Sequence, residues 1–171
     1  MTSEKRNLTF EQALFHFAEM AFGEMGFMLT VPQEELASIP EDIKWLHGCQ
    51  VDFTGPFNGK IFLLATDHIV EPLTLNMLGL MSPDELPPGV DTTDSLKEMA
   101  NVICGNILPA IAGDDAVFDI GGPEITDTPA IPESIAGLKH IACRTLPVEE
   151  GFIRVAFFVD EKAKMPESVE I

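Results

Sequence analysis

Basic residues are scarce in this sequence. It has 10 Lys and Arg against 28 Asp and Glu, which gives a formal net charge of −18 at pH 7. A surface of that charge repels the phosphates of nucleic acids and the headgroups of anionic lipids. Nucleic acid and membrane surfaces are therefore not expected as partners.

Long apolar runs are also absent. A run such as residues 61–65 is far shorter than the ~20 residues of a transmembrane helix. No apolar segment with a cleavage site follows the charged residues 1–7, so we expect no secretory signal and a cytoplasmic location. Because 46% of the residues are hydrophobic and only 22% charged, the chain is expected to fold as a globular domain.

Cysteines are few and widely spaced. Cys49, Cys104 and Cys143 are odd in number, which favours reduced thiols over a disulfide framework. A zinc site could be sought among His47, Cys49, His140 and Cys143. The odd separation of His140 and Cys143 would place them on opposite faces of a strand, so we expect no metal.

Motifs of self-contained phosphate chemistry are missing. No Cys lies six residues before an Arg, and there is no G-x-S-x-G motif. The stretch Gly-Pro-Phe-Asn-Gly-Lys at 55–60 is one residue short of a P-loop and is followed by Ile. An enzyme acting alone on a small phospho-ligand, which remains a third possibility for this chain, has no phosphate cradle to support it.

Hydrophobic periodicity predicts an alternation of helices and hairpins. Thr9 and Gln12 form a capping-box pattern at the start of the first helix, and Asp67 is expected to cap the second. Helices are predicted at 10–27, 67–80 and 92–112, a linker at 82–89, and strands at 46–54, 59–66, 116–120, 139–147 and 151–159.

The outline repeats itself, with a long helix and a hairpin at 10–66 and again at 92–159. It predicts an α+β domain in which two long helices pack on one antiparallel sheet with pseudo-twofold character. We expect a single domain over 1–160, and a loose C-terminal tail at 161–171 because these residues are charged and contain proline.

The second long helix has two contrasting faces. At about 100° per residue, the polar face collects Asp94, Glu98, Asn101 and Gly105 within roughly 60° of Asn101. The opposite face is a predicted core stripe of Leu96, Met99, Ile103, Ile107 and Ala110. Asn106 is expected to point toward the apolar side as a structural hydrogen bonder, and Pro109 to kink or end the helix.

Two residues on the polar face are unfavourable choices for a helix. Asn competes for backbone hydrogen bonds, and Gly105 costs about 1 kcal/mol relative to Ala. Such choices on an exposed face suggest contact with a partner. Alternatively, Asp94 and Glu98 only favour the helix through its dipole, and Asn101 is an incidental surface residue.

The segment from Asp94 to Asn106 resembles the signature of the CheX/CheC/FliY chemotaxis phosphatases. Its core is Glu98-x-x-Asn101, with an acidic residue four positions earlier and Gly-Asn shortly after. Pro123 stands one residue short of the spacing at which some family members carry a proline. The first long helix has Phe where a second Asn would stand, so the chain is most similar to the CheX branch, which implies a homodimer.

This resemblance implies a function. The substrate would be the aspartyl phosphate of a CheY-like response regulator, which supplies its own Lys and Mg²⁺, so no cofactor of this chain's own is expected. Asn101 would orient the attacking water, and Glu98 would pair with the regulator's Lys. Asp94 would assist at the rim, and Gly105 would allow close approach. The alternative is a non-catalytic regulator-binding or flagellar-switch-type module of the same fold.

Overall fold

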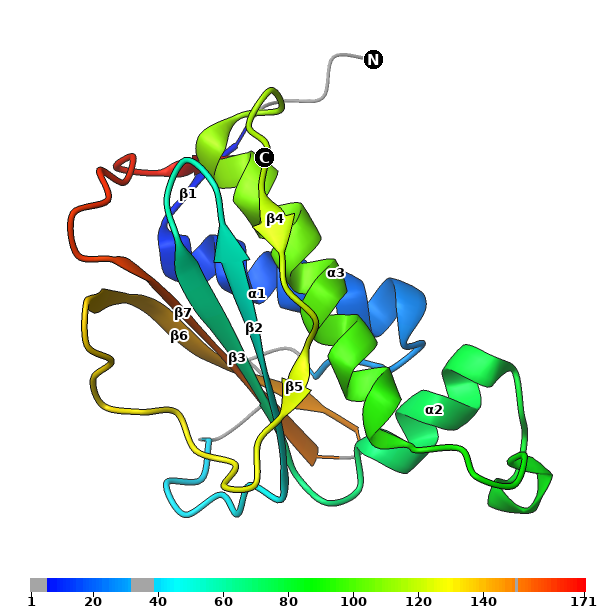
Figure 1. Ribbon diagram of the computed structural model, residues 1–171. Coiled ribbons are helices and arrows are strands. Elements are labelled where there is room, and N and C mark those ends of the chain that lie inside the picture. Colours follow the sequence, from blue (N-terminus) through cyan, green and yellow to red (C-terminus); the bar gives the residue numbers. More distant parts are fainter. Residues whose placement is uncertain (1–5, 32–38, 150) are drawn as a thin grey trace, which may run out of the picture.

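The centre of the molecule is an antiparallel sheet. The computed structural model describes residues 6–31, 39–149 and 151–171. Its long strands lie in the order β2-β3-β7-β6, and the short β4 and β5 both pair with the other edge of β2 (Figure 1). The strands are β2 (His47–Thr54), β3 (Gly59–Ala65), β4 (Asp119–Ile120), β5 (Glu124–Ile125), β6 (Leu138–Val148) and β7 (Gly151–Asp160).

Two long helices cover one face of this sheet. The first is α1 (Phe10–Met20), which continues into the π-helical turn η1 (Ala21–Met25), and the second is α3 (Thr93–Ala112). The predicted capping box is confirmed, since the Gln12 amide donates to Thr9 Oγ1 at 3.2 Å and the Thr9 amide to Gln12 Oε1 at 2.9 Å. No helix within the described ranges is both long and apolar enough to span a membrane.

The predicted repeat of helix and hairpin is confirmed. The hairpins β2–β3 and β6–β7 meet where β3 pairs with β7, with Leu63 opposite Val155. The helix α3 packs against β2 of the first half, and α1 packs against β6 of the second. Each helix therefore lies on the outer strand of the other half's hairpin, which fixes the position of α3 relative to the sheet.

Buried apolar side chains lie on both faces of the sheet, with a large core on one face and a small cluster on the other. The main core lies between the sheet and the two helices, and includes the fully buried Leu14, Phe22, Ile61, Leu63, Leu96, Ile103 and Phe157. On the opposite face a small cluster of Phe62, Ala156 and Phe158 is covered by the loop residues Ile131 and Ile135.

The predicted start and N-cap of the second helix were wrong. The second helix, α2, spans Val70–Leu78, and its N-cap is Ile69, which provides no side-chain hydrogen bond. Asp67 lies outside the helix, with Oδ1 3.8 Å from His47 Nε2. The linker before α3 includes a 3-10 turn, η3 (Pro83–Glu85), and the short β5 was not predicted at all.

The end of the chain is not a loose tail. Residues Val169–Glu170 form β8, which pairs with β1 (Asn7–Leu8). Val169 is fully buried in the main core. Composition indicated a tail because the segment is charged. The buried Val169, the partly buried Ala163, Met165 and Ile171, and the pairing with β1 hold it against the core instead.

A β-bulge changes the orientation of residues in β6. His140 pairs with Phe158 and Ala142 with Phe157, so Ile141 is the extra residue. His140 contacts the Phe158 ring, and Cys143 packs in the same small cluster. The two residues thus share a face, contrary to the prediction, because the bulge shifts the alternation by one. Across the described residues no three His, Cys, Asp or Glu gather in a group that could hold a metal ion.

Candidate functional site

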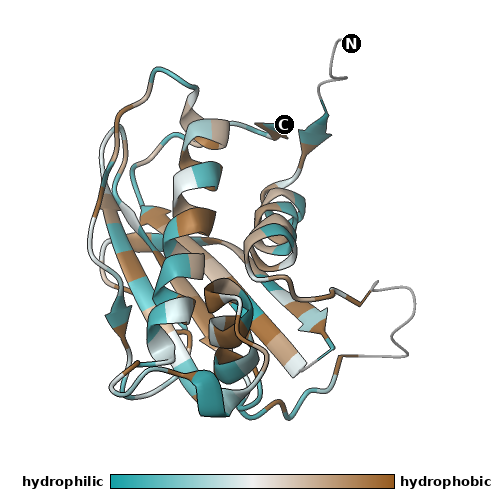
Figure 2. Cartoon of the chain, turned by 90° about the vertical axis from the view of Figure 1, so that its right-hand side faces the viewer, coloured by the Kyte–Doolittle hydropathy of each residue, from teal (hydrophilic) through white to brown (hydrophobic). Residues whose placement is uncertain are grey.

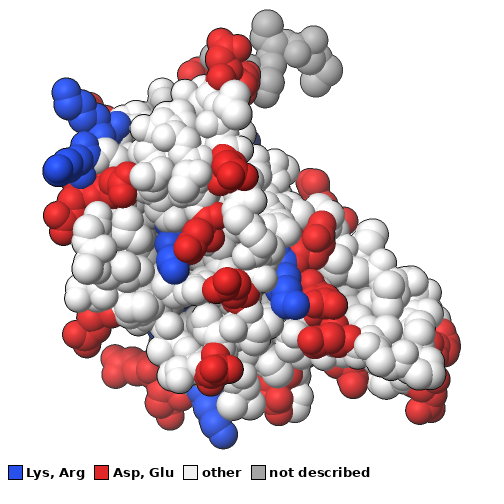
Figure 3. Space-filling model, viewed as in Figure 1, with Lys and Arg blue, Asp and Glu red and all other residues white. Residues whose placement is uncertain are grey.

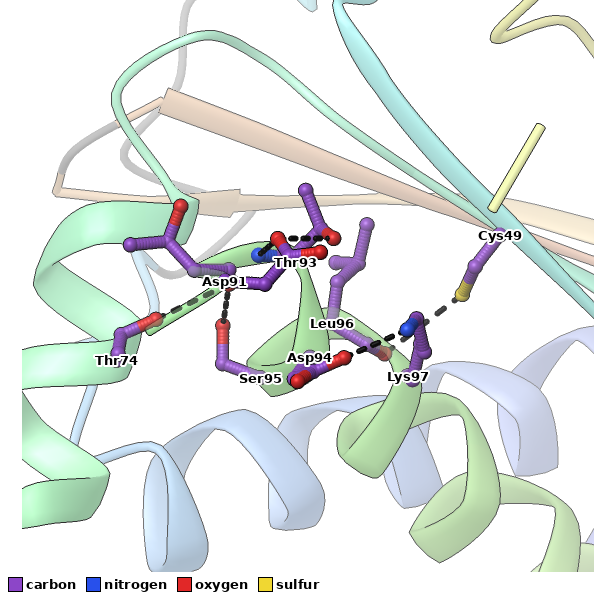
Figure 4. Close-up of polar contacts among 9 residues, drawn as sticks. Cys49, Thr74, Asp91, Thr93, Asp94, Ser95, Leu96 and Lys97 are labelled. Carbon is purple, nitrogen blue, oxygen red and sulfur yellow. Dashed lines mark hydrogen bonds and ion pairs between the residues drawn. The ribbon is translucent and has the colours of Figure 1, made fainter. Parts of the chain in front are cut away.

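The N-terminus of α3 is fixed by short polar contacts. Asp91 Oδ1 accepts from the Thr93 amide at 2.9 Å and from its hydroxyl at 2.6 Å, and these hydrogen bonds lower the pKa of Asp91. Ser95 Oγ donates to the Thr92 carbonyl at 2.7 Å (Figure 4). The Thr74 hydroxyl of α2 donates to the same carbonyl at 3.0 Å, so α2 helps to position the start of α3.

The two faces of α3 follow the predicted register. The core stripe is confirmed, although Ala110 is only partly buried; its residues Leu96, Met99, Ile103 and Ile107 are fully buried. Figure 2 shows apolar and polar residues alternating along this helix. Asp94, Glu98 and Gly105 are exposed, and Asn101 is half-buried.

Glu98 and Asn101 are unpaired. Within the described part of the chain, neither the Glu98 carboxylate nor the Asn101 amide has a hydrogen-bond or ion-pair partner. They lie three residues apart on α3, where side chains are neighbours on the helix surface. The amide can therefore donate and accept toward a docked molecule, and the carboxylate can pair with a cation that such a molecule brings.

Asp94 is paired, and its partner was missed. Lys97 Nζ lies 2.6 Å from Asp94 Oδ1, and this hydrogen bond raises the pKa of Lys97 (Figure 4). Lys97 stands three residues after Asp94 and four before Asn101, a spacing that places it on the same side of the helix. Helical spacing alone could have identified it.

The end of α3 agrees with the predicted range, but one residue of its last turns does not. Of the two effects expected of Pro109, the helix does not end there: α3 continues to Ala112, and the Gly113 amide donates to the Pro109 carbonyl at 2.7 Å. Asn106 is exposed rather than turned to the core, although its amide makes the expected structural hydrogen bond, to the Val102 carbonyl at 2.7 Å. Leu108, which was not part of the predicted core stripe, is buried. The segment before β4 passes beside this part of the helix, and the two line a cavity together.

The first half of the fold has no matching site. The positions that would correspond to Glu98 and Asn101 are Glu19 and Phe22. Phe22 is fully buried in the core, and Glu19 accepts a hydrogen bond from the Thr30 hydroxyl at 3.2 Å. Phe27 is exposed but lies beyond η1, with a positive φ of 50°. The Glu-x-x-Asn pair therefore occurs on α3 and not on the helix related to it by the pseudo-twofold.

The two buried thiols on or beside α3 are inert. Cys49 of β2 donates weakly to the Leu96 carbonyl at 3.7 Å, and burial raises its pKa to about 12. Burial also raises the pKa of Cys104 to about 12. A thiol in this state is not a nucleophile at neutral pH.

A known family matches most of the fold that positions this site. The model of the family described as "Chemotaxis phosphatase CheX" matches residues 47–145, which is more than half of the chain. The matched region includes α3 and three of the four long strands in whole or in large part.

Solved structures confirm the architecture. The chemotaxis protein CheX from Desulfovibrio desulfuricans superposes with a TM-score of 0.62 at 17% identity, over 87% of this chain and 97% of that one. CheX from Vibrio vulnificus gives 0.62 at 18% identity, over 87% and 95%. The CheX–CheY–BeF₃–Mg²⁺ complex from Borrelia burgdorferi gives 0.60 at 14% identity, over 88% and 97%. At these identities the likeness shows the fold.

The sequence is also similar to part of a much longer protein. Unconventional myosin-Ib from Homo sapiens is 25% identical over 145 residues, which is 85% of this chain. The chain spans only 11% of the length of that myosin. So small a share supports no inference about activity.

Proposed function

This chain belongs to the CheX family of chemotaxis phosphatases, and from that premise we propose that it accelerates hydrolysis of the aspartyl phosphate of a CheY-like response regulator in the cytoplasm. The observation that carries the proposal is the pair Glu98 and Asn101, spaced as in the family signature and unpartnered on the outer face of α3. The chain is thus a hydrolase that acts on another protein.

Asn101 orients the attacking water. An acyl phosphate is already activated, so the helper needs no nucleophile of its own; it needs an amide that holds water in line with phosphorus. The Asn101 carbonyl oxygen accepts from the water, and the side chain does not ionise at any working pH. Its half-buried position limits the rotamers available to it, which favours a fixed direction for that oxygen.

Glu98 sets the docking register. Its exposed carboxylate pairs with the lysine of the regulator's active site, and a charge pair of this kind governs orientation and encounter rate. Mg²⁺ belongs to the regulator in this proposal. In its support, the Borrelia burgdorferi complex contains CheY, BeF₃ and Mg²⁺.

Replacing Asn101 by Ala tests the water-positioning role. We expect Asn101→Ala to reduce stimulated phosphate release by about a hundredfold or more while leaving regulator binding nearly intact, because the amide acts in the transition state. Phosphate release is measured at varied concentrations of a phosphorylated regulator, chosen from a panel, alongside a direct binding assay. Asn106→Ala, on another side of α3, is the matched control and should turn over like the wild type.

Glu98→Ala should behave differently. Loss of the docking charge is expected to raise KM and weaken binding by about tenfold at low salt. This loss should shrink as added salt screens the charge pair in the wild type, whereas the defect of Asn101→Ala should not depend on salt. If both variants released phosphate like the wild type, α3 would be a binding surface only. The chain would then be a non-catalytic regulator-binding or flagellar-switch-type module.

A further inference from the structure

One cation stands within the proposed site. Among the residues of α3, Thr93–Ala112, Lys97 is the only Lys or Arg. At about 100° per residue it lies about 40° to one side of Asn101, whereas Glu98 lies about 60° to the other side. The Asn101 amide is therefore flanked by the Lys97 ammonium group on one side and by the Glu98 carboxylate on the other. We call this surface of α3, formed by Asp94, Lys97, Glu98, Asn101 and Gly105, the docking face.

Lys97 is held in place by its neighbour. Its Nζ lies 2.6 Å from Asp94 Oδ1, and the Lys97 side chain is 30% exposed while that of Asp94 is 68% exposed. Figure 4 shows the two side chains turned toward each other on the first turns of α3. An ammonium group has three N–H donors, and Asp94 takes one, so the others remain for a ligand.

Lys97 is a positive charge on a mostly acidic surface. Figure 3 shows acidic side chains spread over this face of the molecule, with few basic ones among them. A protein of net charge −18 repels an acyl phosphate and the carboxylates beside it. A local cation at the point of contact offsets this repulsion.

We propose that Lys97 binds a phosphoryl oxygen of the regulator's acyl phosphate, and that Asp94 is a positioning residue that directs Lys97 toward it. Residues four apart on a helix have Cβ atoms about 5–6 Å from each other, so a phosphoryl group next to the Asn101 amide is within reach of the lysine. The contact makes affinity depend on the phosphoryl group. The inference rests on the proposed function, and it gives Asp94 a defined role in place of a general one at the rim.

The test compares a regulator with and without its phosphoryl mimic. Affinity is measured for CheY-like regulators in Mg²⁺, free and loaded with beryllofluoride. Lys97→Met keeps the unbranched stem but removes the charge, and is expected to lower the preference for the loaded form by about tenfold or more. Lys97→Arg should retain most of that preference. Lys60→Met is the matched control: Lys60 pairs with Asp52 at 2.9 Å and lies over Phe62 on the opposite face of the sheet.

Asp94→Asn separates positioning from direct contact. If Asp94 acts through Lys97, the substitution reduces the preference in the wild type and has no further effect in the Lys97→Met background. Equal weakening of loaded and free regulator by Lys97→Met would overturn the inference, since the lysine would then contact a carboxylate or act at long range. A failure of the proposed function would be seen in a different measurement: the Asn101→Ala variant would then stimulate phosphate release as fast as the wild type does.

Discussion

At the scale of residues, the docking face combines groups that cost helix stability. Gly105 is exposed, and a Cβ added there would meet nothing within 4 Å, so the fold places no steric demand for glycine. Its carbonyl is also the one that loses its helical donor, because Pro109 has no N–H. Glycine at this position is therefore better explained by an approaching partner than by packing within the chain.

We predict that Gly105→Ala stabilises the protein and impairs its function. The substitution should raise the free energy of unfolding by about 1 kcal/mol, since Gly is a poor helix former and the site is open. It should also raise the KM for the phosphorylated regulator, because the added methyl group projects toward the partner. Urea denaturation and phosphate release measure the two effects. Gain of stability with unchanged KM would show that the partner does not approach this position.

At the scale of elements, the β1–β8 ribbon closes the core at one end. Val169 is fully buried although its strand has only two residues. The Arg6 amide donates to the Ile171 carbonyl at 2.9 Å, and the Ile171 amide to the Arg6 carbonyl at the same distance. The stability of this ribbon therefore depends on Val169, on the partly buried Leu8 and Ile171, and on a few backbone hydrogen bonds.

Val169→Ala is predicted to lower the free energy of unfolding by about 1–2 kcal/mol, because two methyl groups leave a packed site. Denaturant unfolding measures the change. Val117→Ala removes the same groups from a side chain that is 82% exposed, and should stay within about 0.5 kcal/mol of the wild type. Equal effects of the two substitutions would mean that β8 contributes nothing to the core.

The elements also show where sequence reasoning succeeds and where it fails. The register of α3 could be predicted because helical periodicity is local, and the faces that carry Met99 and Glu98 follow from it. The bulge at Ile141 depends on the pairing of β6 with β7, and β8 depends on a strand at the other end of the chain. Periodicity within one segment does not carry that information. The Asp94–Lys97 pair, by contrast, could have been predicted from helical spacing, because the two residues are three positions apart on α3.

At the scale of the whole molecule, the two edges of the sheet differ. The edge of β2 is covered by β4 and β5. On the other side β6 is the last strand among the described residues, and residues 29–31 reach the backbone of its C-terminal end through Val31, Thr30 and Leu29. The rest of this edge has no strand partner within the described ranges, and an open strand edge is a site for pairing with another chain.

We propose that the protein is a homodimer joined along β6, as the resemblance to the CheX branch implies. A twofold axis would place two such edges together. Light scattering at micromolar concentration should give twice the monomer mass, and backbone amides of β6 should exchange more slowly as concentration rises. The amides of β4 and β5 serve as the internal reference. A monomer mass at that concentration would contradict the proposal.

The β1–β8 ribbon also brings Arg6 and Ile171 side by side, so the described backbone from Arg6 to Ile171 is close to a closed ring. The ring consists of two similar helix-and-hairpin halves. Which half comes first in the sequence depends only on the position at which the backbone is interrupted. A circular permutant in which a linker joins Ile171 to Arg6 and the chain opens at η3, between α2 and α3, would run α3–β6–β7 first and α1–β2–β3 second. The sheet order and the face that carries Asn101 would be the same in both chains.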